Sequence, residues 1–199
     1  KIAKVIDNFS PDVAAISVLF SNLLESAHNI AKIIKKVKKN TTVILGGNHI
    51  SSAVTDYNVS KLTGDSGLPE IINDLENDHF DFAMTGEGEF SFLEVTNKLI
   101  NKEDISKIPG LVKRISPKKY LINPPTRIHS LNLLPRPARH LVDMEAYFKI
   151  GAFHSAKSRS KRVLSVMRSR GCPEKCTFCS TPQMWGNNTR WRTTDHIMD

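Results

Sequence analysis

Short apolar runs alternate with amphipathic segments along the first 115 residues of the chain. Runs at 13–18, 42–45 and 80–84 have the length and composition of buried strands. Residues 22–39 repeat apolar side chains at helical spacing. The opposite face of that helix carries four lysines, which we expect to face solvent: Lys32, Lys35, Lys36 and Lys39.

Further helices are predicted at 68–77 and 89–100, and a small hairpin at 111–114 and 120–122. Residues between His49 and Pro69 are interpreted as an extra surface loop or a cover for a ligand. Strands that alternate with helices at this spacing predict the α/β class, with a doubly wound parallel sheet wrapped by helices.

The periodic pattern weakens from residue 124 to residue 162, where four prolines occur. We interpret this segment as a linker that packs partly on its neighbours through four leucines: Leu131, Leu133, Leu134 and Leu141. The apolar run 163–167 then predicts a new strand. The expected division is a first domain at 1–123, a linker at 124–162 and the start of a second domain at 163–199.

Charge is distributed unevenly over the 199 residues, whose net charge is +8. Residues 1–100 have 9 Lys and Arg against 13 Asp and Glu, and residues 101–199 have 19 against 7. A basic half suits nucleic acid, an anionic ligand or simply a charged surface. Aromatic residues are not interleaved with the basic ones, so nucleic acid is disfavoured as a partner.

No apolar run reaches the roughly 20 residues that span a bilayer, and no secretory signal opens the chain. The few, clustered cysteines suit a reducing cytosol, which predicts a cytoplasmic protein. The chain begins with Lys1, and its last helical pattern stops at Asp199. We therefore expect a fragment of a longer protein.

All three cysteines of the chain lie within eight residues, as Cys172-x3-Cys176-x2-Cys179. An odd number of cysteines cannot pair completely into disulfides within the chain. Three thiolates on one loop suit a [4Fe–4S] cluster whose fourth iron stays open. Zinc with His154 or His196 as a fourth ligand is an alternative, and a redox-active Cys176–Cys179 pair is another.

This cysteine loop resembles the signature of the radical S-adenosylmethionine (radical SAM) enzymes, in which an aromatic residue, here Phe178, precedes the last cysteine. The resemblance implies that S-adenosylmethionine binds the open iron beside Phe178 and is cleaved to a 5′-deoxyadenosyl radical. It also implies that residues 163–199 begin a partial (βα)6 barrel that is truncated here. Four later residues are interpreted either as packing at the rim of the barrel with solvated arginines, or as lining of the cofactor or substrate entrance: Trp185, Arg190, Trp191 and Arg192.

Small residues follow the three predicted parallel strands, at Ser17-Val-Leu19, Gly46-Gly47 and Gly86-Glu-Gly-Glu89. Ligands of doubly wound sheets bind at these strand ends, although a glycine there usually means only a turn. Residues 20–45, which separate Leu19 from Gly46, number 26. This spacing is similar to the Ser-x-Leu and Gly-Gly segments of the flavodoxin-like cobalamin-binding domain of methionine synthase and the B12 mutases.

The cobalamin resemblance implies that Ser17, Leu19, Gly46 and Gly47 surround the nucleotide tail of cobalamin. It adds four candidate contacts: Asn48, His49, Gly86 and Glu87. His49 is interpreted as a hydrogen-bonding loop residue and not as a cobalt ligand. Glu87 and Glu89 either bind a ribose or amide group or place charge at a helix N-terminus. The first strand of the sheet, with the segment that ligates cobalt in the mutases, is expected to be missing.

Together the two parts resemble cobalamin-dependent radical SAM enzymes, and Leu134-Pro-Arg-Pro-Ala-Arg139 is similar to the segment that joins the two domains in that family. The resemblance implies methyl transfer to an unactivated carbon. It further implies a small-molecule or peptide substrate and an electron donor of the flavodoxin or ferredoxin type. No catalytic residue is assigned, and the fragment alone is expected to be inactive.

Two alternatives stay open: a radical cyclase or rearrangement enzyme with the same cofactors, and a non-catalytic cobalamin-binding or iron–sulfur sensor. A tRNA methylthiotransferase is disfavoured, because that family has three more cysteines in its N-terminal domain. Residues 1–171 contain none.

Overall fold

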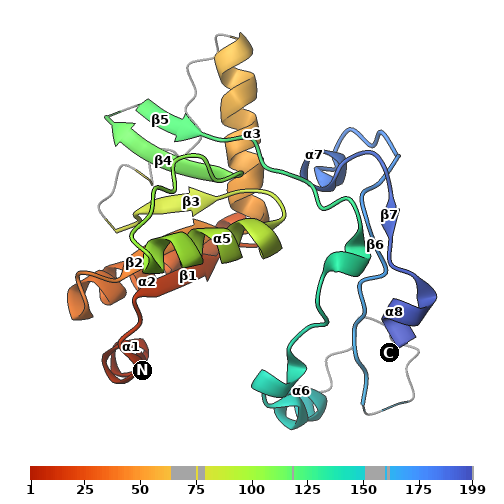
Figure 1. Ribbon diagram of the computed structural model, residues 1–199, viewed down its shortest axis with the longest axis horizontal. Coiled ribbons are helices and arrows are strands. Elements are labelled where there is room, and N and C mark those ends of the chain that lie inside the picture. The colour runs from red at the N-terminus through yellow and green to blue at the C-terminus, as the bar shows by residue number, and fades with distance from the viewer. Residues whose placement is uncertain (64–74, 76–78, 118, 151–159, 161, 199) are drawn as a thin grey trace.

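The computed structural model describes residues 1–63, 75, 79–117, 119–150, 160 and 162–198. A five-stranded sheet has the order β1-β2-β3-β4-β5 (Figure 1). The first two neighbour pairs are parallel, and β4 and β5 form an antiparallel hairpin beside β3. The strands are β1 (Val13–Ser17), β2 (Thr42–Gly46), β3 (Phe82–Met84), β4 (Leu111–Ser116) and β5 (Lys119–Ile122).

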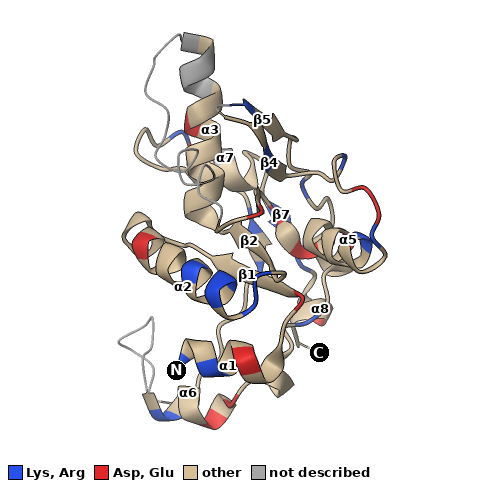
Figure 2. Ribbon diagram, turned by 90° about the vertical axis from the view of Figure 1, so that its left-hand side faces the viewer, with Lys and Arg blue, Asp and Glu red and all other residues tan. Residues whose placement is uncertain are grey.

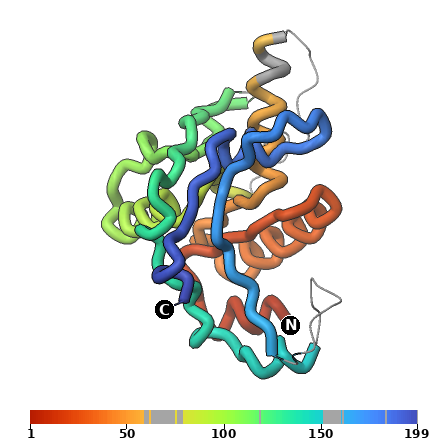
Figure 3. The backbone as a smooth tube through the Cα atoms, turned by 90° about the vertical axis from the view of Figure 1, so that its right-hand side faces the viewer, coloured from red at the N-terminus to blue at the C-terminus, as the bar shows by residue number. Residues whose placement is uncertain are grey.

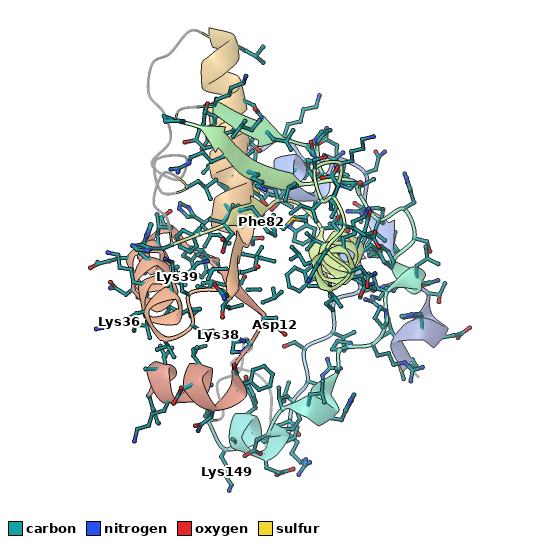
Figure 4. The ribbon with its side chains drawn as sticks, turned by 60° about the vertical axis from the view of Figure 1, so that its left-hand side comes forward. Asp12, Lys36, Lys38, Lys39, Phe82 and Lys149 are labelled. Carbon is teal, nitrogen blue, oxygen red and sulfur yellow. The ribbon has the colours of Figure 1, made fainter. Side chains whose placement is uncertain are left out.

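Helices cover both faces of this sheet. On one face, α2 (Leu24–Val37) and α3 (Asn48–Thr63) pack against Val43 and Leu45. On the other face, α5 (Gly88–Ile100) packs through Val95 against Ile44 and Phe82, and Phe82 lies inside the molecule in Figure 4. A mixed α/β fold, parallel over its first three strands, is therefore confirmed.

Helix α2 forms where its apolar spacing predicted it, and it buries Ala27, Ala31 and Ile34. A short 3-10 helix, η1 (Ser21–Leu23), precedes it, and α1 (Ile2–Phe9) lies beside it. Figure 2 shows Lys and Arg along the outer side of α2. The expectation that these lysines face solvent is wrong for Lys35, which is half-buried.

Lys35 is held at the start of the sheet by Asp81, the residue before β3. Its Nζ lies 2.7 Å from Asp81 Oδ2 and donates to the carbonyl oxygen of Thr41 at 2.8 Å. The same carboxylate oxygen accepts a hydrogen bond from Val43 N–H at 2.6 Å. Lys38, by contrast, is 3.4 Å from Asp12, whose side chain is 97% exposed (Figure 4).

Replacing Asp81 by alanine is expected to lower the free energy of unfolding by about 1–2 kcal/mol, because the Val43 amide and the Lys35 ammonium lose a shared acceptor. Asp12→Ala is the matched control and should cost about 0.5 kcal/mol or less, since it breaks only an exposed ion pair. Urea denaturation of both variants measures the difference. Equal losses would show that Asp81 contributes no more than a surface charge.

The segment after the sheet contains three short helices: η2 (Leu131–Leu133), η3 (Arg139–Leu141) and α6 (Met144–Ile150). Ile128, Leu131 and Leu134 bury together as a small separate core. Leu131 and Leu134 are thus buried, but in a cluster of the linker's own residues, whereas Leu133 and Leu141 are exposed.

The last residues run alongside this segment (Figure 3). Asn132 accepts a hydrogen bond from Thr193 N–H at 3.0 Å, and Arg139 donates to the carbonyl oxygen of Ser165 at 2.8 Å. The elements here are β6 (Ser169–Arg170), α7 (Thr181–Trp185), β7 (Arg190–Trp191) and α8 (Thr194–Met198).

Two sequence predictions are wrong and a third falls outside the described residues. Residues 163–167 are not a strand. Among the described residues after 162, the only strands are β6 and β7, which pair with each other. A strand needs a hydrogen-bonded neighbour, which apolar composition alone does not provide. The expected long loop after His49 begins with the helix α3. The helix expected at 68–77 lies outside the described residues, apart from Leu75, which is buried.

Among the described residues, no helix is both long enough and apolar enough to cross a membrane.

Candidate functional site

A cavity of about 340 Å³ opens where the three parallel strands end. We call it the strand-end cavity. It lies on the α5 side of the sheet, because β2 residues alternate between faces and Gly46 follows Ile44 on that side. Its lining consists of Ala15, Ile16, Ser17, Ile44, Leu45, Gly46, Gly47, Met84, Thr85, Gly86, Gly88 and Phe92.

Four of the candidate cobalamin contacts line this cavity together: Ser17, Gly46, Gly47 and Gly86. They come from three different strand ends, and the parallel register pairs Ser17 with Gly46. The ends of parallel strands meet at one edge of a sheet, which explains why residues so far apart in sequence share one cavity. Most of the remaining lining is apolar, so the cavity suits the apolar part of a bulky ligand.

Three of the four glycines that line the cavity differ in what their missing side chains allow. A Cβ on Gly47 would lie 2.7 Å from Val18 N and closer still to its carbonyl oxygen, and its φ is +104°. A Cβ on Gly86, with φ +78°, would overlap Pro125. Gly46 has no such restriction, since the nearest atom to its Cβ would be Met84 O at 3.5 Å. Positions 47 and 86 therefore require glycine because of their backbone conformation and close packing. The missing side chain of Gly46 instead leaves space in the cavity.

Leu19, Asn48 and His49, the other candidates near these strands, are not in the cavity lining. Leu19 is 52% exposed. His49 Nδ1 lies 3.1 Å from the hydroxyl of Ser21, and His49 N–H donates to Val18 O. This is the hydrogen-bonding role expected for His49. Whether Leu19, Asn48 and His49 contact cobalamin stays a prediction.

The cysteine loop lies at the surface after β6, with all three cysteines free. Cys179 N–H donates to Cys176 O at 3.2 Å, and Cys172 N–H donates to Gly186 O at 3.0 Å. Gly171 has φ +95°, and a Cβ there would overlap Asn188 O. The loop is thus anchored at its start against the turn at 186–188.

Three free thiols on one loop are a donor set that fits an iron–sulfur cluster. Hydrogen bonds from the side chain and the backbone N–H of Thr181 lower the pKa of the Cys179 thiol, which favours the thiolate that ligates metal. Phe178 is 91% exposed. Within the described residues, the cysteines are not drawn together as they would be around a metal ion.

A charged cluster that the sequence did not reveal connects the cavity to the cysteine loop. The Glu87 carboxylate lies 2.9 Å from Arg170 Nη1 and 2.6 Å from Arg190 Nη2. Arg170 also pairs with Glu89. Burial works to raise the pKa of Glu89, but the hydrogen bond and charge of Arg170 outweigh it and hold that pKa below its ordinary value.

Two tryptophans that follow the cysteine loop make cation–π contacts with arginines in and beside this cluster. Arg170 lies over the ring of Trp185 at 4.9 Å, and Arg168 lies over Trp191 at 5.2 Å. Arg190 donates to the carbonyl oxygens of Trp185 and Ile128. Trp185 therefore has the packing role that sequence analysis gave as one of two interpretations, whereas the solvated arginine of that interpretation is wrong for Arg190, whose side chain is 13% exposed.

A second cavity, of about 410 Å³, lies between α3, β5 and α7. Ser52 of α3 and Met184 of α7 meet at its edge, with Oγ and Sδ 3.7 Å apart. Thr85 and Gly86 line both this cavity and the strand-end cavity. The loop that begins at Thr85 thus lies at the centre of the candidate site.

Several of the known proteins to which the chain is similar are named methyltransferases. Over its whole length it is 28% identical to cytidylyl-2-hydroxyethylphosphonate methyltransferase of Streptomyces wedmorensis, of which it covers 38%. It is 25% identical over 90% of its length to the cobalamin-dependent radical SAM methyltransferase TokK of Streptomyces tokunonensis, of which it covers 23%. No protein-family profile matches the chain.

Two structures of the radical SAM methyltransferase TsrM from Kitasatospora setae share the fold over the whole chain, with TM-scores of 0.64 and 0.58. The sequence identities are 17% and 16%, and the chain covers 35% and 36% of those chains. One contains tryptophan and an analogue of S-adenosylmethionine, and the other contains cobalamin and a [4Fe–4S] cluster. The chain spans well under half the length of these relatives. Cobalamin-dependent radical SAM methyltransferases are among its homologues, which confirms the resemblance found in the sequence.

Proposed function

We propose that the chain is the cofactor-binding part of a cobalamin-dependent radical SAM methyltransferase that methylates an unactivated carbon. The observation that carries this proposal is the convergence of two sites on one loop. Gly86 lines the strand-end cavity, and the next residue, Glu87, pairs with Arg170, two positions before Cys172. A cobalamin site and a cluster site so joined would let both cofactors serve one substrate.

Cys172, Cys176 and Cys179 would hold the [4Fe–4S] cluster, with S-adenosylmethionine beside Phe178. The cluster would supply an electron to S-adenosylmethionine, and cobalamin would supply the methyl group that is transferred. Ser17, Gly46, Gly47 and Gly86 would receive the nucleotide tail of cobalamin, since the strand-end cavity is largely apolar and they line it. The exposed loop gives an electron donor of the flavodoxin or ferredoxin type access to the cluster.

On this proposal, residues 1–123 form a flavodoxin-like cobalamin domain, residues 124–162 a linker, and residues 163–199 the start of a radical SAM barrel. The helices on both faces of the sheet support the first assignment, and the likeness to TsrM supports the order of the parts. The substrate would be a small molecule or a peptide. Most of its binding site would come from parts of the protein other than these 199 residues.

Replacing Gly46 by valine is expected to weaken cobalamin binding at least about tenfold, because the added side chain enters the strand-end cavity and displaces the ligand. Gly46→Ala adds one methyl at ordinary contact distance and should weaken binding less. Lys36→Val, on the exposed side of α2, is the control for a change that is remote from the cavity. Hydroxocobalamin binding measured by visible absorption gives the three affinities, and equal affinities would place cobalamin elsewhere.

The activity is tested with the intact protein, reconstituted anaerobically with iron, sulfide and hydroxocobalamin and then reduced in the presence of S-adenosylmethionine, which can methylate the reduced cobalt. A methyltransferase of this type should form both 5′-deoxyadenosine and S-adenosylhomocysteine, because one S-adenosylmethionine is cleaved and another renews the methyl group. 5′-Deoxyadenosine alone would favour a cyclase or rearrangement enzyme. Neither product would contradict an enzymatic function and favour a sensor.

A further inference from the structure

Glu87 occupies an unusual position for a residue at the start of a helix. It is the N-cap of α5, yet its side chain makes no capping hydrogen bond and is 1% exposed. Both of its carboxylate oxygens face arginines, with Oε2 at Arg170 and Oε1 at Arg190. The preceding residue, Gly86, has φ +78° and packs against Pro125. The turn thereby aims the carboxylate away from the cavity and toward the last part of the chain.

The two arginines come from paired strands. Arg170 of β6 and Arg190 of β7 are partners in the antiparallel register. Their side chains are 9% and 13% exposed. Arg170 reaches Glu87 and Glu89 at once through its two terminal nitrogens, a fork that lysine cannot reproduce.

Because this cluster is buried, the loss of one of its charges costs more free energy than the loss of one partner of a surface ion pair. Charges out of water are costly unless they are paired, so each group depends on its partners being present. Two carboxylates face two guanidinium groups, which balances the charge. A neutral replacement of Glu87 would leave Arg190 without a carboxylate and Arg170 with Glu89 alone.

The cluster also fixes the cysteine loop. Gly171, between Arg170 and Cys172, has φ +95° and lies against Asn188. Cys172 N–H is bonded to Gly186 O, only four residues from Arg190. Arg170 and Arg190 therefore hold both strands from which the loop and its supporting turn emerge.

We propose that Glu87 is a positioning residue: with Glu89, Arg170 and Arg190 it forms an ionic latch that fixes the cysteine loop relative to the strand-end cavity. Through this latch, a ligand bound in the cavity would also hold the cysteine loop more firmly in place, because Gly86 lines the cavity and Glu87 follows it directly. The identity of the cavity's ligand rests on the proposed function. The latch itself rests only on the contacts between these four side chains.

This role differs from the direct cobalamin contact that sequence analysis predicted for Glu87. Glu87 is absent from the lining of the strand-end cavity, whereas its neighbours Gly86 and Gly88 are part of it. Its Oε2 accepts a hydrogen bond from Arg170, and its Oε1 lies 2.6 Å from Arg190 as an ion pair without hydrogen-bond geometry. Direct contact and latch predict different affinities for cobalamin in a Glu87 variant, so one set of variants separates them.

The first experiment measures backbone hydrogen exchange by mass spectrometry in the intact protein without cofactors. Glu87→Gln is expected to speed exchange at least about tenfold in residues 168–180 and 186–192, because a buried arginine loses its partner. Glu103→Gln is the matched control, since it breaks only an exposed pair with Lys98 at 3.9 Å, and it should leave both segments unchanged. Unchanged exchange in Glu87→Gln would overturn the latch.

The pair itself is tested with Arg170→Gln and the double variant. If the two side chains act through one contact, the double variant should exchange no faster than the faster single variant. Rates that multiply in the double variant would show that the residues act independently, which would contradict the latch.

The second experiment repeats hydrogen exchange with hydroxocobalamin present. In the wild-type protein, cobalamin is expected to slow exchange in residues 168–180, and Glu87→Gln should bind cobalamin with similar affinity but lose this slowing. A stability effect alone would not remove the response to the ligand. A tenfold loss of affinity in Glu87→Gln would instead show direct contact and overturn the latch. If the wild-type protein binds no cobalamin, the proposed function fails, while the cofactor-free comparison still decides the latch.

Discussion

Replacing Cys176 by alanine is expected to abolish assembly of the iron–sulfur cluster in the intact protein. Within these 199 residues no other cysteine is present to replace the lost ligand. Anaerobic reconstitution followed by iron and sulfide analysis should give less than about a tenth of the wild-type iron content, because a cube with two thiolate ligands is not retained. Cobalamin binding should not change, since Cys176 is absent from the lining of the strand-end cavity.

Thr177→Ala is the matched control for that loss, because it alters the neighbouring exposed residue of the same loop and removes no thiol. It should retain iron at the wild-type level. If Cys176→Ala also retains wild-type iron, the cluster assignment is wrong. Zinc retained in place of iron by the wild-type protein would favour the alternative of a zinc site.

Replacing Gly47 by alanine is expected to destabilise the protein by about 3 kcal/mol or more, because the new Cβ would overlap the backbone of Val18 at a positive φ. Neither Val18 nor Gly47 can move away easily, since His49 N–H is bonded to Val18 O and Val18 N–H to Gly46 O. Chemical denaturation followed by circular dichroism measures the loss.

Gly46→Ala provides the comparison, as it makes the same change one residue earlier at ordinary contact distance. It should change stability by less than about 1 kcal/mol, since no strained conformation is imposed. If the two variants were equally destabilised, glycine would be required by the backbone at both positions. Gly46 would then not be the glycine whose main role is to leave space in the cavity.

Local pattern was enough to predict the three parallel strands and the hairpin, but not that the hairpin joins the sheet antiparallel to β3. Each parallel strand is a short apolar run, and α2 and α5 have clear helical spacing, so their sequences determine them largely alone. The convergence of Ser17, Gly46 and Gly86 also followed, because ends of parallel strands meet at one edge. The cysteine loop was recognisable from spacing, since a metal cluster fixes the distances between its ligands.

Contacts between distant segments could not be predicted. Glu87 lies 83 residues before Arg170, and nothing in either local sequence identifies the other as its partner. The run 163–167 has strand composition, but pairing depends on what lies beside it. Helix α3 was missed although its buried residues Ile50, Ala53, Val54 and Tyr57 recur at helical spacing. The serines, threonines and asparagines among them are typical of loops, and they favoured the interpretation as a loop.

The most direct test of the account is an anaerobic titration of the protein with hydroxocobalamin, read by visible absorption after gel filtration. The strand-end cavity predicts retention of about one cobalamin per chain, with the base-off spectrum expected when the nucleotide tail leaves cobalt and enters the protein. Gly46→Val should retain much less. If wild-type protein retains no more cobalamin than Gly46→Val, the cavity does not bind this cofactor and the central claim is contradicted.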